Sequence, residues 1–342
     1  MADPKPTESE QEVLALQQEL LAMMAEAVAA GLTAQQVAVK AKQITARRTR
    51  AVEEAVRRDI QAKFEGAVEL EAKRAKKAAG GKSGAFSAGI DAATLTDTEY
   101  RAVRAVARNL LTGMTDSSVG IYRAALAQAE RGVSLTGERA VKDAVRSMAE
   151  QGVYAFTYTR ADGTLVRVPS DVAVRRVANN AGRRSQWAQR KAMAEANGYD
   201  LIEVPYSDNC RETHEVIDGG IFSLSGESEE YPPWLPEYDD LLEEPNCQHN
   251  PPLIYHPSLG RTYSDPYEGM DEEEKAERQR ELTNQRRMQN DLRKAKRAAR
   301  EVRNAGQDAR EANAKARAAA GKLHAYEDEK GLRRQQYRER AY

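Results

Sequence analysis

Each of the two cysteines in this chain has a histidine close behind it in the sequence. Cys210 precedes His214 and Cys247 precedes His249, so half of the four histidines stand beside the only two cysteines. Zinc in structural sites takes four tetrahedral ligands from thiolate and imidazole, commonly as two close pairs that the fold brings together. Spacing alone leaves two interpretations open: a structural zinc site, or two buried cysteines with hydrogen-bonded histidines.

Two other uses of these residues are less favoured. A disulfide between Cys210 and Cys247 is disfavoured in a reducing compartment. A catalytic zinc needs an open coordination position and a nearby general base, and Glu212 or Glu215 could take that role. Charged loop residues are usually only solvated, however, so we expect no catalytic residue and no enzyme activity.

The composition predicts a soluble chain with a modest core. Charged residues make up 31% of the 342 residues and aromatic residues 6%, which is lean material for one large core. The net charge of −1 gives no global preference for nucleic acid or membrane. No apolar run approaches the ~20 residues of a membrane-spanning helix, and the opening MADPKPTESEQE lacks the features of a signal peptide. We therefore expect synthesis in a reducing cytoplasm and no membrane contact.

The first eighty residues are predicted to form two helices. Apolar residues recur three and four positions apart, and Thr33 with Gln36 has the form of a capping box that starts the second helix. This stripe could pack within the chain or be reserved for another subunit. Because the second helix precedes a flexible segment, we expect a partner chain to cover part of its stripe, which consists of Val52, Val56, Ile60, Phe64 and Val68.

A segment rich in glycine, alanine and serine, residues 78–92, is the best candidate for a linker. After it, Thr96 with Glu99 suggests another helix start. Further helices are expected as far as Gln151, and the glycines that separate them are Gly113, Gly120 and Gly132.

The hydrophobic period changes from helical to alternating in residues 153–169. Aromatic and smaller residues alternate there around Asp162-Gly163, which predicts a β-hairpin. A helix is predicted to follow from Ser170 and to end just before Gly198. A short apolar strand is then expected over residues 200–205.

Four stretches of the sequence, taken in order, resemble the tailed-phage minor capsid proteins of the type called phage minor capsid protein 2. They are GVYAFTYTRADGTLVRVP, ANNAGRRSQWAQRKAMAEANGYDLIEVP, HEVIDGGIFSLSG and PNCQHNP, and the resemblance covers roughly residues 150–260. In that family a Cys or His stands five positions before a glycine, as His214 stands before Gly219. An Asn-Cys-Arg-His signature corresponds to residues 246–249, with Gln248 in place of the arginine. Cys210 lies one residue before the first position of the family's Cys-x-x-Cys pair.

With the resemblance added, a structural zinc held by Cys210, His214, Cys247 and His249 becomes the favoured interpretation. We therefore predict a mostly helical α+β chain, in which a small zinc-tied core is flanked by long N- and C-terminal helices. The predicted domains are a helical arm (1–80), a linker and helical subdomain (81–150), the α+β core (151–265), and an acidic linker with a basic C-terminal helix (266–342).

The basic segment near the C-terminus has the most uneven charge. From Arg278 to Lys322 fourteen basic residues face five acidic ones, an excess of nine positive charges. So polar a helix should project into solvent or lie on a partner, either as a solvated spacer or in contact with DNA or an acidic capsid surface. The basic helix 175–191 also leaves two interpretations open, contact with nucleic-acid phosphates or a solvated basic face. The residues we predict to contact nucleic acid or capsid are Arg293, Lys294, Lys296, Arg297 and Arg300.

The resemblance implies a structural minor capsid protein. Such a protein would be made in the host cytoplasm and built into the phage head in many copies of a symmetric particle, where it contacts the portal protein, the major capsid protein or packaged DNA. The alternative function is a DNA-binding accessory protein that acts in genome packaging or ejection. Salt-sensitive DNA affinity without incorporation into particles would favour this alternative.

Overall fold

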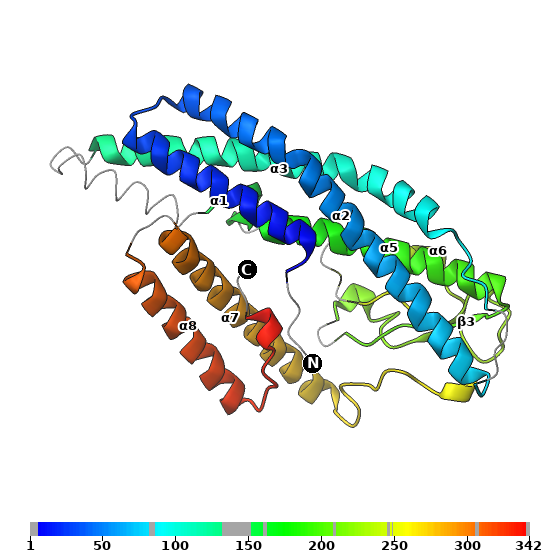
Figure 1. The fold of residues 1–342 in the computed structure, drawn as a ribbon. Helices are drawn as coiled ribbons and strands as arrows, with labels where there is room; N and C mark the ends of the chain where they lie inside the picture. The colour runs from blue at the N-terminus through cyan, green and yellow to red at the C-terminus, as the bar shows by residue number, and fades with distance from the viewer. Residues whose placement is uncertain are drawn as a thin grey trace. The chain divides into compact units, whose positions relative to one another are not determined.

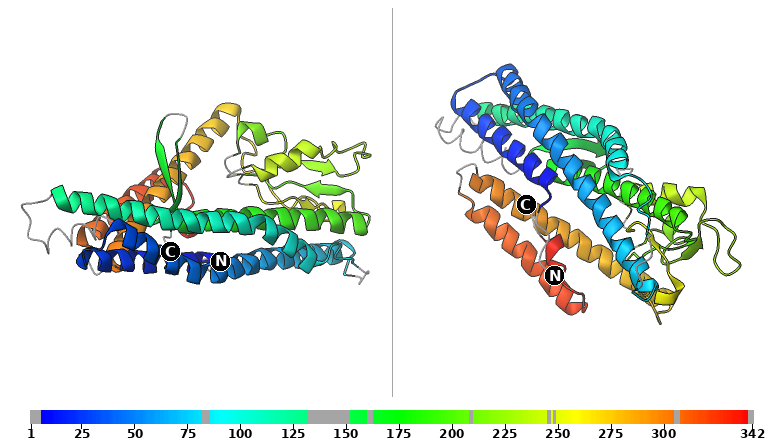
Figure 2. Two further views of the ribbon diagram at one scale, coloured as in Figure 1. Left: turned by 90° about the horizontal axis from the view of Figure 1, so that it is seen from above. Right: turned by 45° about the vertical axis from the view of Figure 1, so that its right-hand side comes forward.

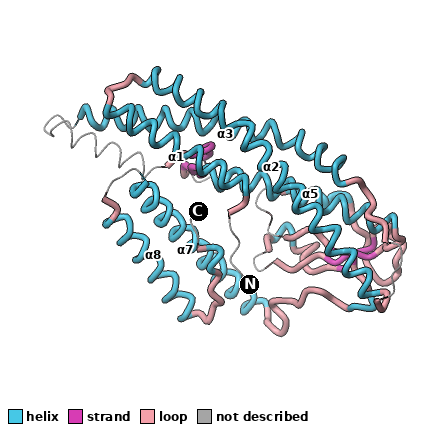
Figure 3. The backbone as a smooth tube through the Cα atoms, viewed as in Figure 1, coloured by secondary structure: helices cyan, strands magenta, loops and turns pink. Residues whose placement is uncertain are grey.

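The computed structural model describes residues 6–81, 86–131, 152–159, 163–207, 210–244, 247, 249–304 and 308–339. Helices dominate it and strands are few (Figures 1 and 3), which confirms the predicted mostly helical α+β class. The helices are α1 (Glu8–Ala29), α2 (Ala34–Ala78), α3 (Ala92–Arg131), α5 (Ser170–Ala196), α6 (Pro236–Glu243), α7 (Glu272–Asn304) and α8 (Arg310–Glu329). The strands are β1 (Tyr154–Thr159), β2 (Leu165–Pro169), β3 (Leu201–Glu203), β4 (Ile221–Ser223) and β5 (Leu253–Ile254), with 3-10 turns η1 (Glu212–His214), η2 (Pro257–Leu259) and η3 (Gln336–Arg338).

The chain forms two compact units, and each is assembled from separate segments. Unit 1 comprises Met1–Val56, Arg104–Val177 and Asn284–Tyr342. Unit 2 comprises Arg57–Val103 and Ala178–Thr283. The divisions between the units fall inside α2, α3, α5 and α7.

Unit 1 contains α1 and the parts of α2 and α3 that pack with it. The capping box predicted at the start of α2 is confirmed, because the Gln36 amide donates to Thr33 Oγ1 (3.3 Å) and the Thr33 amide donates to Gln36 Oε1 (2.8 Å). The Tyr122 hydroxyl on α3 donates to the Leu32 carbonyl at 2.6 Å, which ties α3 to the turn between α1 and α2. The fully buried side chains of this unit include Leu16, Leu20, Met24, Met114 and Tyr122.

The apolar stripe on α2 is covered by the chain itself. Val52, Val56, Ile60 and Phe64 are all at most 1% exposed, and Val68 packs against the buried cluster around Met193. The expectation that a partner chain covers this stripe is therefore wrong. At about 0.8 kcal/mol per buried methylene, polar substitutions there should unfold the protein instead of blocking a docking surface.

Helix α3 differs from its prediction at both its start and its middle. It begins at Ala92 with Asp91 as the cap, whose Oδ2 accepts from the Thr94 amide at 2.8 Å, so the start predicted from Thr96 and Glu99 is wrong. It also runs without interruption through Gly113 and Gly120, which were expected to separate helices. Gly132 and the expected helix up to Gln151 lie outside the described residues.

The predicted β-hairpin is confirmed in unit 1. Strands β1 and β2 pair in antiparallel register with Tyr158 opposite Val166, and the hairpin stands out from the helices in Figure 2. At its base Ala155 and Val168 are each 2% exposed, and the Ser170 hydroxyl donates to the Val153 carbonyl at 2.8 Å. Towards the tip the apolar side chains emerge, with Tyr158 42% exposed and Leu165 58% exposed. Asp162, in the expected turn, lies outside the described residues.

Unit 2 holds a three-stranded antiparallel sheet in the order β4-β3-β5. The predicted strand after α5 is confirmed as β3, and Gly198 ends the preceding helix at a positive φ of 66°, where glycine has no steric cost. Strand β3 pairs Ile202 with Phe222 of β4 and with Ile254 of β5. The core between this sheet and α5 consists of Trp187, Ile202, Val204, Ile217 and Phe222, with α6 residues packed at its edge.

In unit 1, α7 and α8 form an antiparallel pair (Figure 1). Gln285 donates to Glu327 Oε1 at 2.7 Å near one end, and Arg303 donates to Asn313 Oδ1 at 3.2 Å near the other. Helix α7 buries one face despite its polar composition, with Leu292 0% and Val302 1% exposed. The expectation that this segment projects as a solvated helix is therefore wrong for that face. Among the described helices, none combines the length and apolar character that crossing a bilayer requires.

Candidate metal centre

Three of the four predicted zinc ligands are brought together in unit 2. His214 is the last residue of η1, and Cys247 and His249 follow α6 by a few residues. His214 and Cys247 are each 1% exposed and His249 is 2% exposed. Cys210 is half-buried and lies at the start of the same loop as η1.

Two distances in this group match the sulfur-to-nitrogen edges of a zinc tetrahedron. Cys247 Sγ lies 3.7 Å from His214 Nδ1 and 3.6 Å from His249 Nδ1. With Zn–S near 2.3 Å and Zn–N near 2.0–2.1 Å, the sulfur-to-nitrogen edge of a tetrahedral site is roughly 3.6 Å. Both rings therefore present the same nitrogen, Nδ1, to one sulfur at the spacing that a shared ion requires.

The outer nitrogen of each ring meets a carboxylate. His214 Nε2 lies 3.0 Å from Glu244 Oε2, and His249 Nε2 lies 2.7 Å from Asp218 Oδ1. A carboxylate accepts, so each Nε2 carries the proton and each Nδ1 can offer a lone pair. Histidine ligands of metals are oriented in this way by a second carboxylate or carbonyl partner.

Cys210 lies on the far side of the His249 ring from Cys247. Its Sγ is 3.7 Å from His249 Nε2, the outer nitrogen, and it groups with Asp218 instead of with Cys247. The two nitrogens of an imidazole point in divergent directions, so one ion bound at Nδ1 cannot also be reached by a thiol placed at Nε2. The structure thus gathers three of the predicted ligands and leaves Cys210 in a neighbouring group.

The electrostatic surroundings favour a positive charge between the sulfur and the rings. Burial raises the pKa of the Cys247 thiol, but the hydrogen bonds and charge of His249, together with Arg183, lower it to a net value below its usual range. Burial lowers the pKa of His249, but hydrogen bonds to Asp218, Cys210 and Cys247 raise it to about 11. A thiol whose pKa is lowered, facing an imidazole whose pKa is raised, is a place where a metal ion can replace the protons between them.

Local structure fixes the loop that carries these groups. Gly219 adopts a φ of +67°, and a side chain there would collide with the Tyr206 ring. Asp218 Oδ1 also accepts from the Ser207 amide at 2.7 Å, which holds the carboxylate toward His249. From α5, Arg183 Nη1 donates to the Cys247 carbonyl at 2.6 Å and anchors the second ligand segment.

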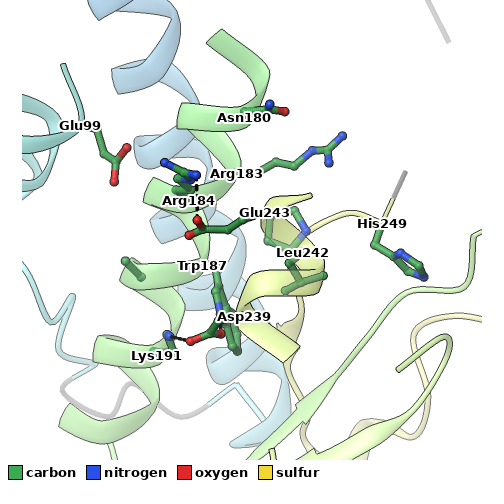
Figure 4. Close-up of a pocket in the computed structure, with 12 residues that line it drawn as sticks. Glu99, Asn180, Arg183, Arg184, Trp187, Lys191, Asp239, Leu242, Glu243 and His249 are labelled. Carbon is green, nitrogen blue, oxygen red and sulfur yellow. Dashed lines mark hydrogen bonds and ion pairs between the residues drawn. The ribbon is translucent and has the colours of Figure 1, made fainter. Parts of the chain in front are cut away.

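A cavity of about 140 Å³ adjoins this centre, and His249 forms part of its wall (Figure 4). Four of its charged lining residues form two ion pairs, because Arg184 bonds Glu243 and Lys191 bonds Asp239, each at 2.7 Å. Lys191 also lies over the Trp187 ring, 5.1 Å from its centroid. These pairs use the basic face of the predicted helix 175–191 within the fold, which weakens the case for phosphate binding there.

Most of the basic residues predicted to contact DNA or capsid are engaged within unit 1. Lys296 donates to the Glu339 carbonyl at 2.9 Å, Arg297 bonds Asp171 at 2.7 Å, and Arg300 bonds Glu301. Burial, with the nearby charges of other arginines, lowers the pKa of Arg293 to about 10. Of the five predicted residues, Lys294 is the exposed one.

A family model described as phage minor capsid protein 2 matches residues 16–328. The chain belongs to this family. Membership extends well beyond the 150–260 region that carries the motifs, and it confirms the predicted resemblance. No match is found among curated proteins or solved structures. For a phage minor capsid protein 2 member, the role is structural and the location is the virion.

The carboxylates of the centre were not found from the sequence of this minor capsid protein. Asp218 and Glu244 stand at no motif spacing, and the glutamates considered there, Glu212 and Glu215, are exposed. One signal was available for Asp218, because it follows His214 by four residues across a turn in which its amide donates to the His214 carbonyl. Glu244 reaches the site only because α6 ends there, which is a property of the fold.

Proposed function

We propose that this protein is a fixed component of the phage head, present in several copies beside the portal or in the shell. The family match over residues 16–328 is the observation that carries the proposal. In this role the protein contacts the portal protein, the major capsid protein or packaged DNA. The exposed hairpin tip at Tyr158 and Leu165 offers an apolar surface for such a contact.

We also infer that one zinc ion binds Cys247, His214 and His249, with Asp218 and Glu244 orienting the rings. The donor spacing of 3.6–3.7 Å and the two outer carboxylates support this assignment. The ion would join the loop after β3 to the segment after α6. Because the strands of unit 2 are only two or three residues long, a metal would supply stability that so small a sheet lacks.

The alternative, a DNA-binding accessory protein, draws less support from the positions of its candidate residues. Lys296, Arg297 and Arg300 already bond to protein groups, so releasing them for phosphates would cost those interactions. DNA binding through other exposed basic residues of α7 and α8 is compatible with either function.

The decisive experiment is the composition of washed particles. Phage carrying the wild-type gene should retain the protein at a constant copy number per head after washing in high salt, as judged by quantitative mass spectrometry. A salt-labile protein that leaves intact, infectious heads behind would favour the accessory function. A protein absent from heads but bound to DNA in lysates would contradict the structural proposal.

A further inference from the structure

A second group of potential metal ligands lies in unit 1, apart from the cysteine and histidine centre. It consists of His324 and Glu327 on α8 and Glu339 directly after η3. One ligand atom from each residue lies within 4.8 Å of the other two. None of the sequence motifs discussed above includes these three residues.

The local fold explains how these three residues meet. His324 and Glu327 are three positions apart on α8, so both side chains lie on one face. The chain reverses at Gly331, whose φ is +59°, and the Leu332 amide returns to the Glu327 carbonyl at 2.8 Å. Lys296 on α7 then holds the Glu339 carbonyl at 2.9 Å, which places that residue against α8.

Glu327 is the residue that points to a ligand. Its residue exposure is 3%, and its Oε1 accepts from Gln285 Nε2 at 2.7 Å. Its Oε2 is buried and has no hydrogen-bond partner in the part of the chain described. A buried acceptor that is left unsatisfied destabilises the fold, and a charged one does so more strongly, so a cation at this oxygen would remove a penalty that the fold otherwise carries.

The other two members have donor atoms available to the same point. His324 Nε2 lies 3.4 Å from Glu339 Oε2, and the His324 side chain is 33% exposed, which gives an ion a route from solvent. Arg334 binds both Glu339 oxygens, at 2.8 and 3.0 Å. A carboxylate has about four lone-pair positions, so this pair leaves acceptor capacity on Glu339.

We propose that His324, Glu327 and Glu339 form a second metal site, which takes a divalent transition cation such as Mn²⁺ and clips the C-terminal turn to α8. One imidazole and two carboxylates suit a harder cation than the thiolate-containing centre does. With three protein ligands, water would fill the remaining coordination positions of the ion. The positive charge of Arg334 weakens the field of the two carboxylates, so the site should bind less tightly than a site without it.

Mn²⁺ is the probe that separates this site from the cysteine and histidine centre. The full-length protein, loaded beforehand with one equivalent of Zn²⁺, is titrated with Mn²⁺ while the free-ion signal is followed by electron paramagnetic resonance. Wild type should bind one Mn²⁺. Glu327→Gln and His324→Gln should each weaken binding at least about tenfold, since lesser changes around metal ligands already cost 10–100-fold. Glu329→Gln, at an exposed position on the same helix, is the matched control and should bind as wild type.

The stability of the variants distinguishes a metal site from a simple ion-pair cluster. Glu327→Gln keeps the shape and removes a buried charge, so the metal-free variant should melt at or above the wild-type temperature. Mn²⁺ should slow amide exchange in residues 331–339 of wild type and Glu329→Gln but not of Glu327→Gln. Equal Mn²⁺ binding by all four proteins, or no binding by wild type, would overturn the proposal. The partly exposed His324 keeps the test decisive if Glu327→Gln does not fold.

Discussion

In the cysteine and histidine centre, each imidazole uses its two nitrogens for different partners. Nδ1 of His214 and of His249 faces Cys247, and Nε2 of each faces a carboxylate. This arrangement fixes the tautomers and aligns both rings on one sulfur. It assigns Cys247 the central role among the predicted ligands and gives Cys210 a peripheral one.

The two cysteines should therefore differ in their effect on zinc content. If zinc binds this centre as we propose, Cys247→Ser should release it and lower the melting temperature of unit 2, because metal binding energy is also folding energy. Cys210→Ser is the matched control and should retain most of the metal, since its sulfur lies beyond the outer nitrogen of His249. Metal analysis of the two purified variants checks this. Equal loss of zinc from both would mean that Cys210 joins Cys247 at one ion.

A half-buried lysine on α2 should give unit 2 a specific pH dependence. Burial lowers the pKa of Lys63 to about 8, with Asp59 opposing this and Arg183 adding to it. Between pH 8 and the unfolded value of 10.5 the unfolded chain binds the extra proton, so stability rises with pH across that window. Below pH 8 the folded protein carries the full cost of the buried charge.

Lys63→Met should accordingly stabilise the protein more at pH 7 than at pH 10. The difference is of order 2–3 kcal/mol, from about 1.36 kcal/mol for each unit of pKa shift. Lys77→Met, at an exposed position on the same helix, should show no such pH dependence. Urea unfolding of wild type and both variants at the two pH values measures it. A stabilisation that is the same at both values would show that Lys63 titrates normally.

At the scale of elements, sequence patterns predicted those whose signal is local. The hairpin of β1 and β2, helix α5 with its end at Gly198, and strand β3 each follow from period, turn or cap chemistry. The error in the middle of α3 arose because glycine was taken as a helix boundary. A glycine costs a helix only about 1 kcal/mol relative to alanine, which packing elsewhere can offset, and the packing partner is distant in sequence.

Gly113 shows what that distant partner is. A Cβ at this position would overlap the carbonyl oxygen of Ala155 in β1, so glycine is needed for α3 and the hairpin base to approach closely. Gly120, further along the same helix, has nothing within 4 Å of an added Cβ. The two glycines look alike in sequence and differ only in the fold.

Their alanine variants should therefore change stability in opposite directions. Gly113→Ala must displace the backbone of β1 or α3, and overpacking of this kind costs about 1–3 kcal/mol. Gly120→Ala should stabilise by up to about 1 kcal/mol through helix propensity. Thermal and denaturant unfolding of both variants test the pair. Stabilisation by Gly113→Ala would mean that the hairpin does not pack on α3 in solution.

At the scale of the whole molecule, sequence segments and compact units do not coincide. Each unit is made of separate stretches, such as Met1–Val56 with Asn284–Tyr342 in unit 1. Periodicity shows that a face is apolar but not what covers it, which is why the α2 stripe was assigned to a partner and the basic tail to solvent or a partner. Only part of the candidate site could be predicted from the sequence. Cysteine and histidine are rare in this chain, so their clustering stands out. Asp218 and Glu244 cannot be told from other acidic residues until the fold brings them close to the rings.

The basic residues of α7 and α8 fall into two classes, which only the fold distinguishes: those paired within unit 1 and those exposed to solvent. Arg297 and Arg300 are held by Asp171 and Glu301 in unit 1. Exposed members of the same run are better placed for phosphates, and four of them are Arg287, Lys294, Arg317 and Lys322. If the protein binds packaged DNA through these helices, the exposed class should carry the salt-dependent part of the affinity.

Changing the four exposed residues to glutamine should therefore reduce the slope of log affinity against log salt by about 0.9 for each phosphate that the variant no longer neutralises. The fold should remain intact, because these side chains are exposed. Replacing Arg297 and Arg300 with glutamine should instead lower thermal stability, by leaving buried carboxylates without their partners, and should change the slope little. Binding of full-length protein to a duplex of random sequence, measured from low to moderate salt, compares the two variants. A slope unchanged by the exposed set would assign α7 and α8 to protein packing alone, and binding to other head components would then fall to surfaces such as the hairpin tip.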